Sequence, residues 1–210
     1  MPTFTQDALR LLRDPAQFKW YAIVFLGLAI YVYAVEIEKR NWNTVFAGLA
    51  FWSVDWINEV INALVFHFTG KAAIWTTTGS TSFQILIGLN LEIAALFAVA
   101  GIVFAKQLPP DPKTKILGIP NRVALVLGFS IFSVFVEYLL HATGSFHWYY
   151  PWWNERQPLL IVIFGYGNFY AAAALAHDLP TLRKKLRLTG ALAGTAATGL
   201  VVFGPVLGWI

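Results

Sequence analysis

Six stretches of the chain are long and almost wholly apolar, and they decide what the chain can fold into. They span residues 20–37, 44–68, 82–105, 121–141, 158–177 and 188–210. A helix needs roughly 20 apolar residues to cross the hydrocarbon core of a bilayer, so each stretch predicts one crossing. The chain is 58% hydrophobic and 12% charged, whereas soluble domains are about 25% charged. We therefore predict an all-α fold, a polytopic membrane helical bundle of about six transmembrane helices.

Residues 1–19 differ from the rest because they are polar and lack the long apolar core of a signal peptide. Phe4, Ala8, Leu11 and Leu12 recur there at helical spacing, which predicts an amphipathic helix lying at a surface. The predicted organisation is this N-terminal surface helix over 1–19 followed by a single transmembrane helical domain over 20–210.

The distribution of Lys and Arg predicts the orientation, because cytoplasmic loops carry an excess of these residues. One set of alternating loops holds Lys71 and Arg156, and the other holds Lys39, Arg40, Lys106, Lys113, Lys115, Arg122, Arg183, Lys184, Lys185 and Arg187. We expect the second set to be cytoplasmic and both termini to lie outside, although the N-terminal helix adds Arg10, Arg13 and Lys19 to that side. The predicted location is a bacterial inner (plasma) membrane.

The composition of the chain argues against several classes of partner and chemistry. The chain has no Cys, which excludes disulfides, thiolate ligands and Cys nucleophiles. The basic residues form loop clusters and not a stripe interleaved with aromatics, so a nucleic-acid partner is not expected. We predict no metal and no cofactor. In the last stretch Gly190/Gly194 and Gly204/Gly208 are spaced four apart, which favours close helix packing and suggests an oligomer formed through this helix.

The second stretch carries polar residues that a lipid-facing helix would not tolerate. Asp55, Asn58, Glu59 and Asn62 fall within an arc of about 100°, with Trp52 beside it. An ionisable residue near the bilayer centre costs roughly 2.5–3.5 kcal/mol on insertion scales, so this arc should face the bundle interior and have a function. An interhelical hydrogen-bond network is the structural alternative.

Matching polar residues occur in other stretches. Glu92 is placed near mid-depth of the third stretch, Ser130, Ser133, Glu137 and His141 share one stripe of the fourth, and Tyr166 and Tyr170 share one face of the fifth. By depth, Asp55 and Glu92 should lie near the midplane, whereas Glu59, Asn62 and Glu137 should lie in the outer half around a shared cavity.

The loop FHWYYPWWN, residues 146–154, concentrates aromatic side chains at the predicted outer surface. Such a loop can form an interfacial aromatic belt, and it can also form a lid over the cavity, which we expect to open toward it.

A carboxylic acid in an apolar cavity keeps its proton, and a second carboxylate nearby strengthens that tendency. Aromatic ring faces stabilise cations. We therefore expect a lipophilic isoprenoid alkene or epoxide, entering from the bilayer, to be protonated and then cyclised or isomerised. The predicted catalytic acids are Asp55, Glu59, Glu92 and Glu137. The predicted substrate contacts are Trp52, Trp56, Asn58, Asn62, Tyr138, His141, Trp148, Tyr166 and Tyr170.

In size and helical architecture the chain resembles the small integral-membrane terpene cyclases of fungal meroterpenoid pathways. That resemblance implies a bundle that protonates an epoxide or olefin with membrane-embedded acids, one of them a Glu in the second span. Glu59 occupies that span here, following Asn58 and not the usual Trp, with Trp56 three residues before it. The family's second acid is a late Asp, whereas no intramembrane Asp follows Asp55 here, so Glu137 would take that role.

Three other interpretations remain open. The buried acids also suit a proton-coupled transporter, although no inverted repeat is visible and, apart from Pro158 at the start of the fifth stretch, Pro205 is the single Pro within the six stretches. A metal site could use Glu59, Glu137, His141 and His147, since Glu and His four apart share a helix face. The chain could instead be a non-catalytic subunit or a lipid-binding scaffold of a membrane complex.

Overall fold

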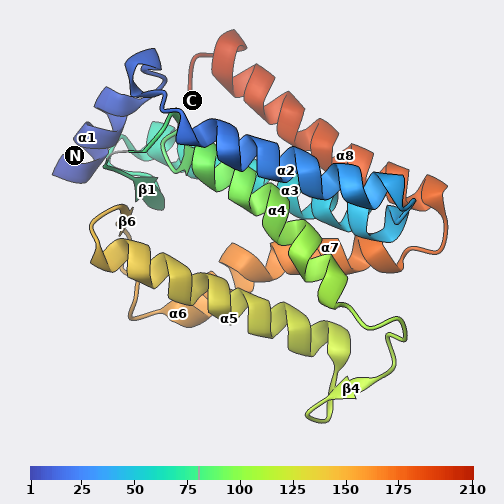
Figure 1. Cartoon of the computed structure of the whole chain (residues 1–210). Helices are drawn as coiled ribbons and strands as arrows, with labels where there is room; N and C mark the ends of the chain where they lie inside the picture. The colour runs from blue at the N-terminus through green and yellow to red at the C-terminus, as the bar shows by residue number, and fades with distance from the viewer. Residues whose placement is uncertain (80) are drawn as a thin grey trace.

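Long helices running side by side form the body of the molecule, as Figure 1 shows for the computed structural model, which describes residues 1–79 and 81–210. They are α2 (Tyr21–Glu38), α3 (Trp42–Thr69), α4 (Leu91–Gln107), α5 (Asn121–Ala142), α7 (Asn168–Asp178) and α8 (Leu182–Val201). α6 (Pro158–Leu160) and the π-helix η2 (Ile161–Gly167) lead into α7, and a second π-helix, η3 (Val202–Val206), extends α8. The predicted all-α membrane bundle is confirmed.

Five of the described helical segments are long and apolar enough to cross a membrane: Tyr21–Glu38, Trp42–Thr69, Asn121–Ala142, Pro158–Asp178 and Leu182–Val206. The remaining predicted crossing, 82–105, is wrong at its start. Residues Gln84–Leu86 (β2) and Leu89–Asn90 (β3) pair as a hairpin, and α4 begins only at Leu91 because the Asn90 side chain accepts the N–H of Ile93 at 2.8 Å. At 17 residues, α4 is about 26 Å long and close to the lower limit for a crossing.

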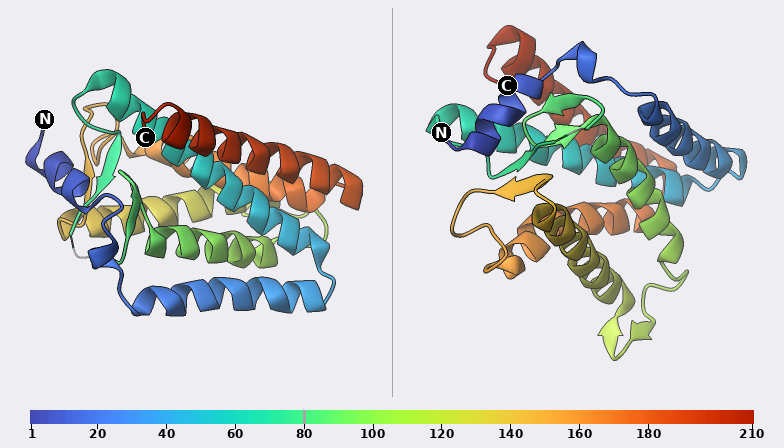
Figure 2. Two further views of the ribbon diagram at one scale, coloured as in Figure 1. Left: turned by 90° about the horizontal axis from the view of Figure 1, so that it is seen from above. Right: turned by 60° about the vertical axis from the view of Figure 1, so that its left-hand side comes forward.

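Helix α3 lies at the centre of the bundle. It packs against α4, α7 and α8, while α2 lies on α4, and the left view of Figure 2 shows α3 between α8 and α4. The α3–α4 contact is close because two glycines meet there: a methyl group added on Gly101 would lie 2.9 Å from the Cα of Gly48. Small residues at such a crossing let the two backbones approach.

One end of the bundle is covered by short strands and loops, which we call the cap: the described residues of 70–90 together with residues 143–157. Within it, β1 (Trp75–Thr77) pairs antiparallel with β6 (Phe146–Trp148). The cap thus joins the α3–α4 connection to the α5–α6 connection. The hairpin of β4 (Lys115–Ile116) and β5 (Ile119–Pro120) lies at the opposite end.

The N-terminal segment forms the predicted amphipathic helix and packs on the cap. The helix, α1, spans Thr3–Leu11 and is followed by the 3-10 turn η1 (Pro15–Gln17), so it ends earlier than position 19. Ala8 is fully buried in a cluster with Ala63, Ala73 and Ile87. The ring of Phe4 stacks on His147 at 4.7 Å. Both termini lie at the cap end (Figure 1), because the six long helices named above run alternately away from the cap and back toward it.

The opposite end carries the clustered Lys and Arg residues, and polar pairs fix its helices. Lys106 of α4 binds the buried Glu36 of α2 at 2.7 Å, and Arg122 of α5 binds Asp178 of α7 with two hydrogen bonds of 2.8 Å. Lys185 of α8 is buried and donates to the carbonyls of Ala176 and His177 at the end of α7. The side of the membrane that this basic end faces stays a prediction.

The last helix begins earlier than the predicted stretch 188–210, because α8 starts at Leu182. Thr181 caps this end, where its side chain accepts the N–H of Lys184. Among its glycines, Gly199 contacts Val60 of α3, whereas a methyl group on Gly190 or Gly194 would have nothing within 4 Å. Those two glycines therefore do not serve packing within the described chain, and an oligomer through this helix stays a prediction.

The close contact at Gly101 should limit the size of the residue there. We expect Gly101→Ala to destabilise the protein by about 1–3 kcal/mol because the added methyl group overpacks the α3–α4 contact. Gly128→Ala in α5 is the matched control: its methyl group meets nothing within 4 Å, so the protein should keep or slightly raise its stability. Thermal unfolding in detergent, followed by size-exclusion chromatography, measures both; equal midpoints for the two variants would contradict the packing argument.

The stacking of α1 on the cap should depend on pH through His147. Burial lowers the pKa of His147 below its ordinary value of 6.5, and the nearby His141 lowers it further, although a hydrogen bond to the Gly144 backbone opposes this. Because the folded state disfavours the protonated ring, stability is present above pH 6.5 and is lost as the pH falls through the lowered pKa.

Hydrogen exchange of residues 3–11 should therefore speed up between about pH 7 and about pH 5. In His147→Phe, which keeps a ring beside Phe4 but cannot titrate, the exchange should lack this pH dependence once intrinsic rates are subtracted. An unchanged dependence in that variant would assign the effect to another group.

Candidate functional site

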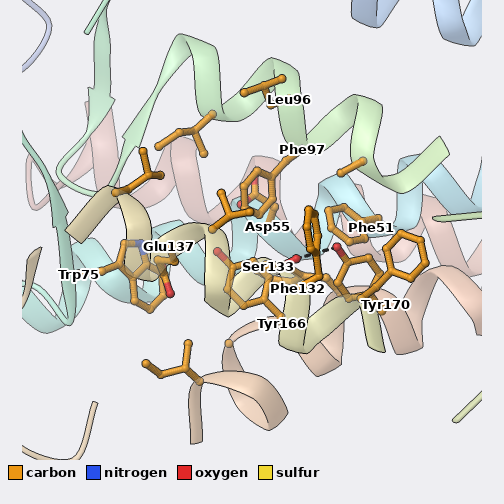
Figure 3. Close-up of a pocket in the computed structure, with 18 of the residues that line it drawn as sticks. Phe51, Asp55, Trp75, Leu96, Phe97, Phe132, Ser133, Glu137, Tyr166 and Tyr170 are labelled. Carbon is orange, nitrogen blue, oxygen red and sulfur yellow. Dashed lines mark hydrogen bonds between the residues drawn. The ribbon is translucent and has the colours of Figure 1, made fainter. Parts of the chain in front are cut away.

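A cavity of about 400 Å³ lies between α3, α4, α5, η2 and α7, next to the cap. Two carboxyl groups enter it from α3, where Asp55 and Glu59 are one turn apart and are 2% and 4% exposed. Their spacing of four residues places them on one face of the helix. The sequence prediction that this face turns inward is confirmed, and Figure 3 shows Asp55 on the cavity wall.

A third carboxyl group, that of Glu137, enters the same cavity from α5 and is 8% exposed. The predicted meeting of Glu59 and Glu137 around a shared cavity is therefore confirmed. Oδ2 of Asp55, Oε2 of Glu59 and Oε2 of Glu137 have no hydrogen-bond partner among the described residues. No Lys or Arg lines the cavity in the described part of the chain. The site thus holds three acids without a counter-ion, surroundings that favour a neutral carboxyl over a charged one.

Trp75 of β1 fixes one of these acids, a contact that was not predicted from the sequence. Its indole N–H donates to Oε1 of Glu59 at 2.8 Å. Its backbone is held in turn by Asn62, whose amide donates to the carbonyl of Trp75 at 2.8 Å and accepts its N–H at 3.1 Å. Gly88 leaves room for this arrangement, because a methyl group there would lie 2.6 Å from Oε2 of Glu59. No sequence signal pairs Trp75 with Glu59, since the contact depends on the path of the cap.

Asn62 consequently serves the structure and not the cavity. It is fully buried and does not line the cavity, against its prediction as a substrate contact. Asn58 is also outside the cavity, and its side-chain oxygen accepts a hydrogen bond from Asn168 of α7 at 3.3 Å. Part of the polar arc of α3 is therefore an interhelical hydrogen-bond network, the alternative that the sequence had left open.

Aromatic rings form nearly half of the remaining wall. Tyr166 and Tyr170 line the cavity as predicted, and the hydroxyl groups of Ser133 and Tyr170 are hydrogen-bonded at 2.8 Å (Figure 3). Tyr166 belongs to the π-helix η2, a wider turn that often occurs at functional sites. The other lining aromatics are Phe51, Trp75, Phe97, Phe129, Phe132, Phe146, Trp153 and Phe169.

Glu92 lies elsewhere, so its predicted mid-depth position is wrong. It sits in the first turn of α4 at the cap end, where it accepts the hydroxyl of Tyr21 at 2.7 Å and the N–H of Ser82 at 2.5 Å. The cause is the hairpin over 84–90, which takes up residues that the hydropathy pattern assigned to the helix. Glu92 does not line the cavity.

Four predicted aromatic contacts also lie outside the cavity, and one of them is Trp148. Trp52 and Trp56 face a separate apolar cavity of about 610 Å³ between α2, α3 and α4, and the indole N–H of Trp52 donates to the carbonyl of Ala94 at 2.9 Å. Tyr138 is 49% exposed on the outer face of α5. Trp56 lies about 100° around α3 from Asp55, whereas Trp52 is directed toward α4 by its hydrogen bond to Ala94.

The aromatic loop closes the cap end of the cavity. Phe146 and Trp153 line the cavity, and Trp148 is buried behind them, whereas Tyr149 and Trp152 are exposed. Because these rings fill the cap end, the cavity does not open toward this loop as predicted. His141 lies against Trp148 and its Nδ1 pairs with the carbonyl of Phe146 at 2.9 Å, outside the cavity. The part of the chain that the structure describes holds no group of three or more His, Asp or Glu arranged for a metal ion, so the alternative metal site is not formed.

The two hydrogen bonds from the Asn62 side chain to the Trp75 backbone, which we call the clamp, should make Asn62 more important to stability than Asn58. We expect Asn62→Leu to lose roughly 2–5 kcal/mol, because the substitution leaves a buried N–H and a buried C=O without partners. Asn58→Leu is the matched control and should lose less than about 1 kcal/mol, since it removes one long bond at a half-buried position. Thermal unfolding in detergent compares them, and similar losses would refute the clamp.

Comparison with known proteins gives the chain a family. A protein of Archaeoglobus fulgidus described as uncharacterized is 45% identical over 211 residues, covering all of both chains. A second uncharacterized protein of that organism is 40% identical over 53 residues, which are 25% of this chain and 95% of the other. No solved structure matches. The model of an uncharacterized membrane protein family matches residues 2–205. The chain therefore belongs to that membrane protein family.

Proposed function

We propose that this protein is a membrane-embedded enzyme that protonates a lipophilic isoprenoid alkene or epoxide and so drives its cyclisation or double-bond isomerisation. One observation carries the proposal: Asp55, Glu59 and Glu137 project into a single cavity whose other walls are apolar and aromatic. Burying three acids together is unfavourable, and ionisable residues that are retained inside a membrane segment commonly mark a functional site. Apolar and aromatic surroundings suit a hydrocarbon substrate.

The acids divide into two kinds by their contacts. Oδ2 of Asp55 and Oε2 of Glu137 accept no hydrogen bond in the described chain, although the side chains of Trp148 and Tyr166 lie close to Glu137. These two carboxyl groups are therefore suited to carry and donate a proton. Glu59 accepts the N–H of Trp75, which suits it to hold negative charge. We assign proton donation to Asp55 and Glu137, and stabilisation of the cation to Glu59.

The reaction needs no added reactant. The donated proton forms an O–H bond to an epoxide oxygen while a C–O bond breaks, or a C–H bond at one end of an alkene while its π bond breaks, and a carbocation results. In cyclisation an internal alkene then attacks the cation, which forms a ring and a new cation; in isomerisation no ring forms. In both cases a carbon next to the final cation loses a proton to the carboxylate left by the donor. The product has the mass of the substrate. Ring faces such as those of Tyr166 and Phe97 line the space where the cation would form.

The resemblance to the integral-membrane terpene cyclases supports the same proposal. Its essential acid corresponds to Glu59, which lies on the second long helix and faces the cavity. Glu137, which has no exact counterpart in that family, lies in the same cavity.

A proton-coupled transporter is supported less well. Such a protein needs a path from the acids to both sides of the membrane. Here the cap end of the cavity is lined by Phe146 and Trp153, and the rings of Phe104, Phe129 and Tyr170 pack together toward the basic end.

The test is turnover of polyprenyl epoxides and polyenes by purified protein in liposomes, with products separated and identified at unchanged mass. We expect Asp55→Asn, Glu59→Gln and Glu137→Gln each to reduce turnover at least about 100-fold, the usual contribution of a general acid. Glu92→Gln, an equally conservative change at a carboxyl outside the cavity, should leave turnover unchanged.

The folded state of each variant is checked by size-exclusion chromatography. Turnover retained in the three cavity variants would overturn the proposal. Proton flux in liposomes that stops in the same variants, without any product, would favour the transporter instead.

A further inference from the structure

Among the described residues, buried or tightly packed side chains line most sides of the cavity. The cap end is filled by Phe146 and Trp153, and the sides along α3 and η2 are formed by buried residues such as Phe51 and Ile161. Toward the basic end, Phe104 is fully buried and packs on Phe129 and Tyr170. A substrate therefore has no route along the bundle axis.

The open side lies between α4 and α5. α5 packs on η2, α7 and the cap, while α4 packs on α2, α3 and α7. Several residues that line the cavity from these two helices are also exposed on the surface of the bundle. We call them the mouth: Leu96, Val103, Phe132, Val136 and Leu140. All five are apolar and lie within helices, as is expected of a surface that faces the hydrocarbon of a bilayer.

The acids are set to one end of this cavity. Glu59 and Glu137 lie near the cap, where Trp75 and Gly88 form the wall, and Asp55 lies one turn further along α3. Toward the basic end the wall becomes Phe129, Phe169 and Val103 without any carboxyl. A molecule that reacts here must bring its reactive group to the cap end while the rest of it occupies the apolar part.

We propose that the substrate is a chain lipid that enters through the mouth with its reactive end first and keeps its hydrocarbon tail in the bilayer. This inference rests on the proposed function and specifies its substrate class: a linear isoprenoid with a terminal alkene or epoxide, and not a compact molecule enclosed whole. The mouth offers no polar side chain to a headgroup, so the trailing part must be apolar as well. Chains of different length share the same reacting end, and the site accepts them alike.

The absence of Cys from the chain permits a direct test with a single introduced thiol. Phe132→Cys places it in the mouth, and Phe135→Cys places it on the same helix outside the cavity lining; the two phenylalanines are 62% and 56% exposed. Each variant is prepared with and without a bulky pyrene maleimide on the thiol. Activity is not needed, because entry is measured by photolabelling.

The probe is a linear polyprenyl epoxide in liposomes, carrying a diazirine either beside the epoxide or at the far end of the tail. On illumination the first probe should label α3 and η2 around Asp55 and Tyr166, and the second should label the mouth or the lipid. We call the labelling of α3 and η2 deep labelling. Pyrene on the Phe132→Cys variant should abolish the deep labelling, whereas pyrene on the Phe135→Cys variant should leave it intact.

Deep labelling that survives pyrene in the mouth, or deep labelling by the tail probe, would overturn the inference. Deep labelling that behaves as expected without any turnover of the epoxide would instead leave the route of entry established and reject the proposed chemistry.

Discussion

Three uncompensated carboxyl groups in an apolar cavity set the main constraint on this fold. A charge there would interact strongly in a medium of low dielectric constant, and no cation in the described cavity wall offsets it. The helices that carry the acids must therefore be held by other contacts. Half of the α3 span is buried in the bundle, and the glycine contact between Gly48 and Gly101 presses it against α4. The packing of α3 offsets the unfavourable burial of Asp55 and Glu59.

The cap connects this site to parts of the chain that are distant in sequence. Trp75 binds Glu59 through its side chain and Asn62 through its backbone, and its strand pairs with β6. Strand β6 carries His147, on which Phe4 of α1 stacks. The position of one acid therefore depends on a cap that is itself fixed on both sides. If the cap moved as a lid, Trp75 would be drawn away from Glu59. The cap is therefore better understood as a fixed wall of the site than as a lid over it.

Hydropathy was sufficient to predict the helical bundle, and the helical angle was sufficient to place Asp55 and Glu59 on one face of α3, because both depend on local periodicity. Depth along the helices then brought Glu59 and Glu137 to a shared cavity. Glu92 was misplaced since the apolar residues 82–90 satisfy a hydropathy window equally well as a hairpin. The role of Asn62 and the contact of Trp75 could not be predicted, because each depends on where a loop returns to a helix. The ion pair of Glu36 with Lys106 was missed for the same reason: its partners are 70 residues apart.

The side opening follows from the lengths and attachments of two helices. α4 starts late because Asn90 caps it, and it stays with α2 and α3. α5 is attached through η2, α7 and β6 and is otherwise exposed along its outer face. Between them, apolar residues that line the cavity are also exposed on the surface of the bundle. A polar molecule would have to leave water and cross the apolar mouth, at a cost of several kcal/mol for each unpaired group, whereas a hydrocarbon chain crosses it without loss. Under the proposed function, the same geometry that shelters the acids also selects the solvent from which the substrate comes.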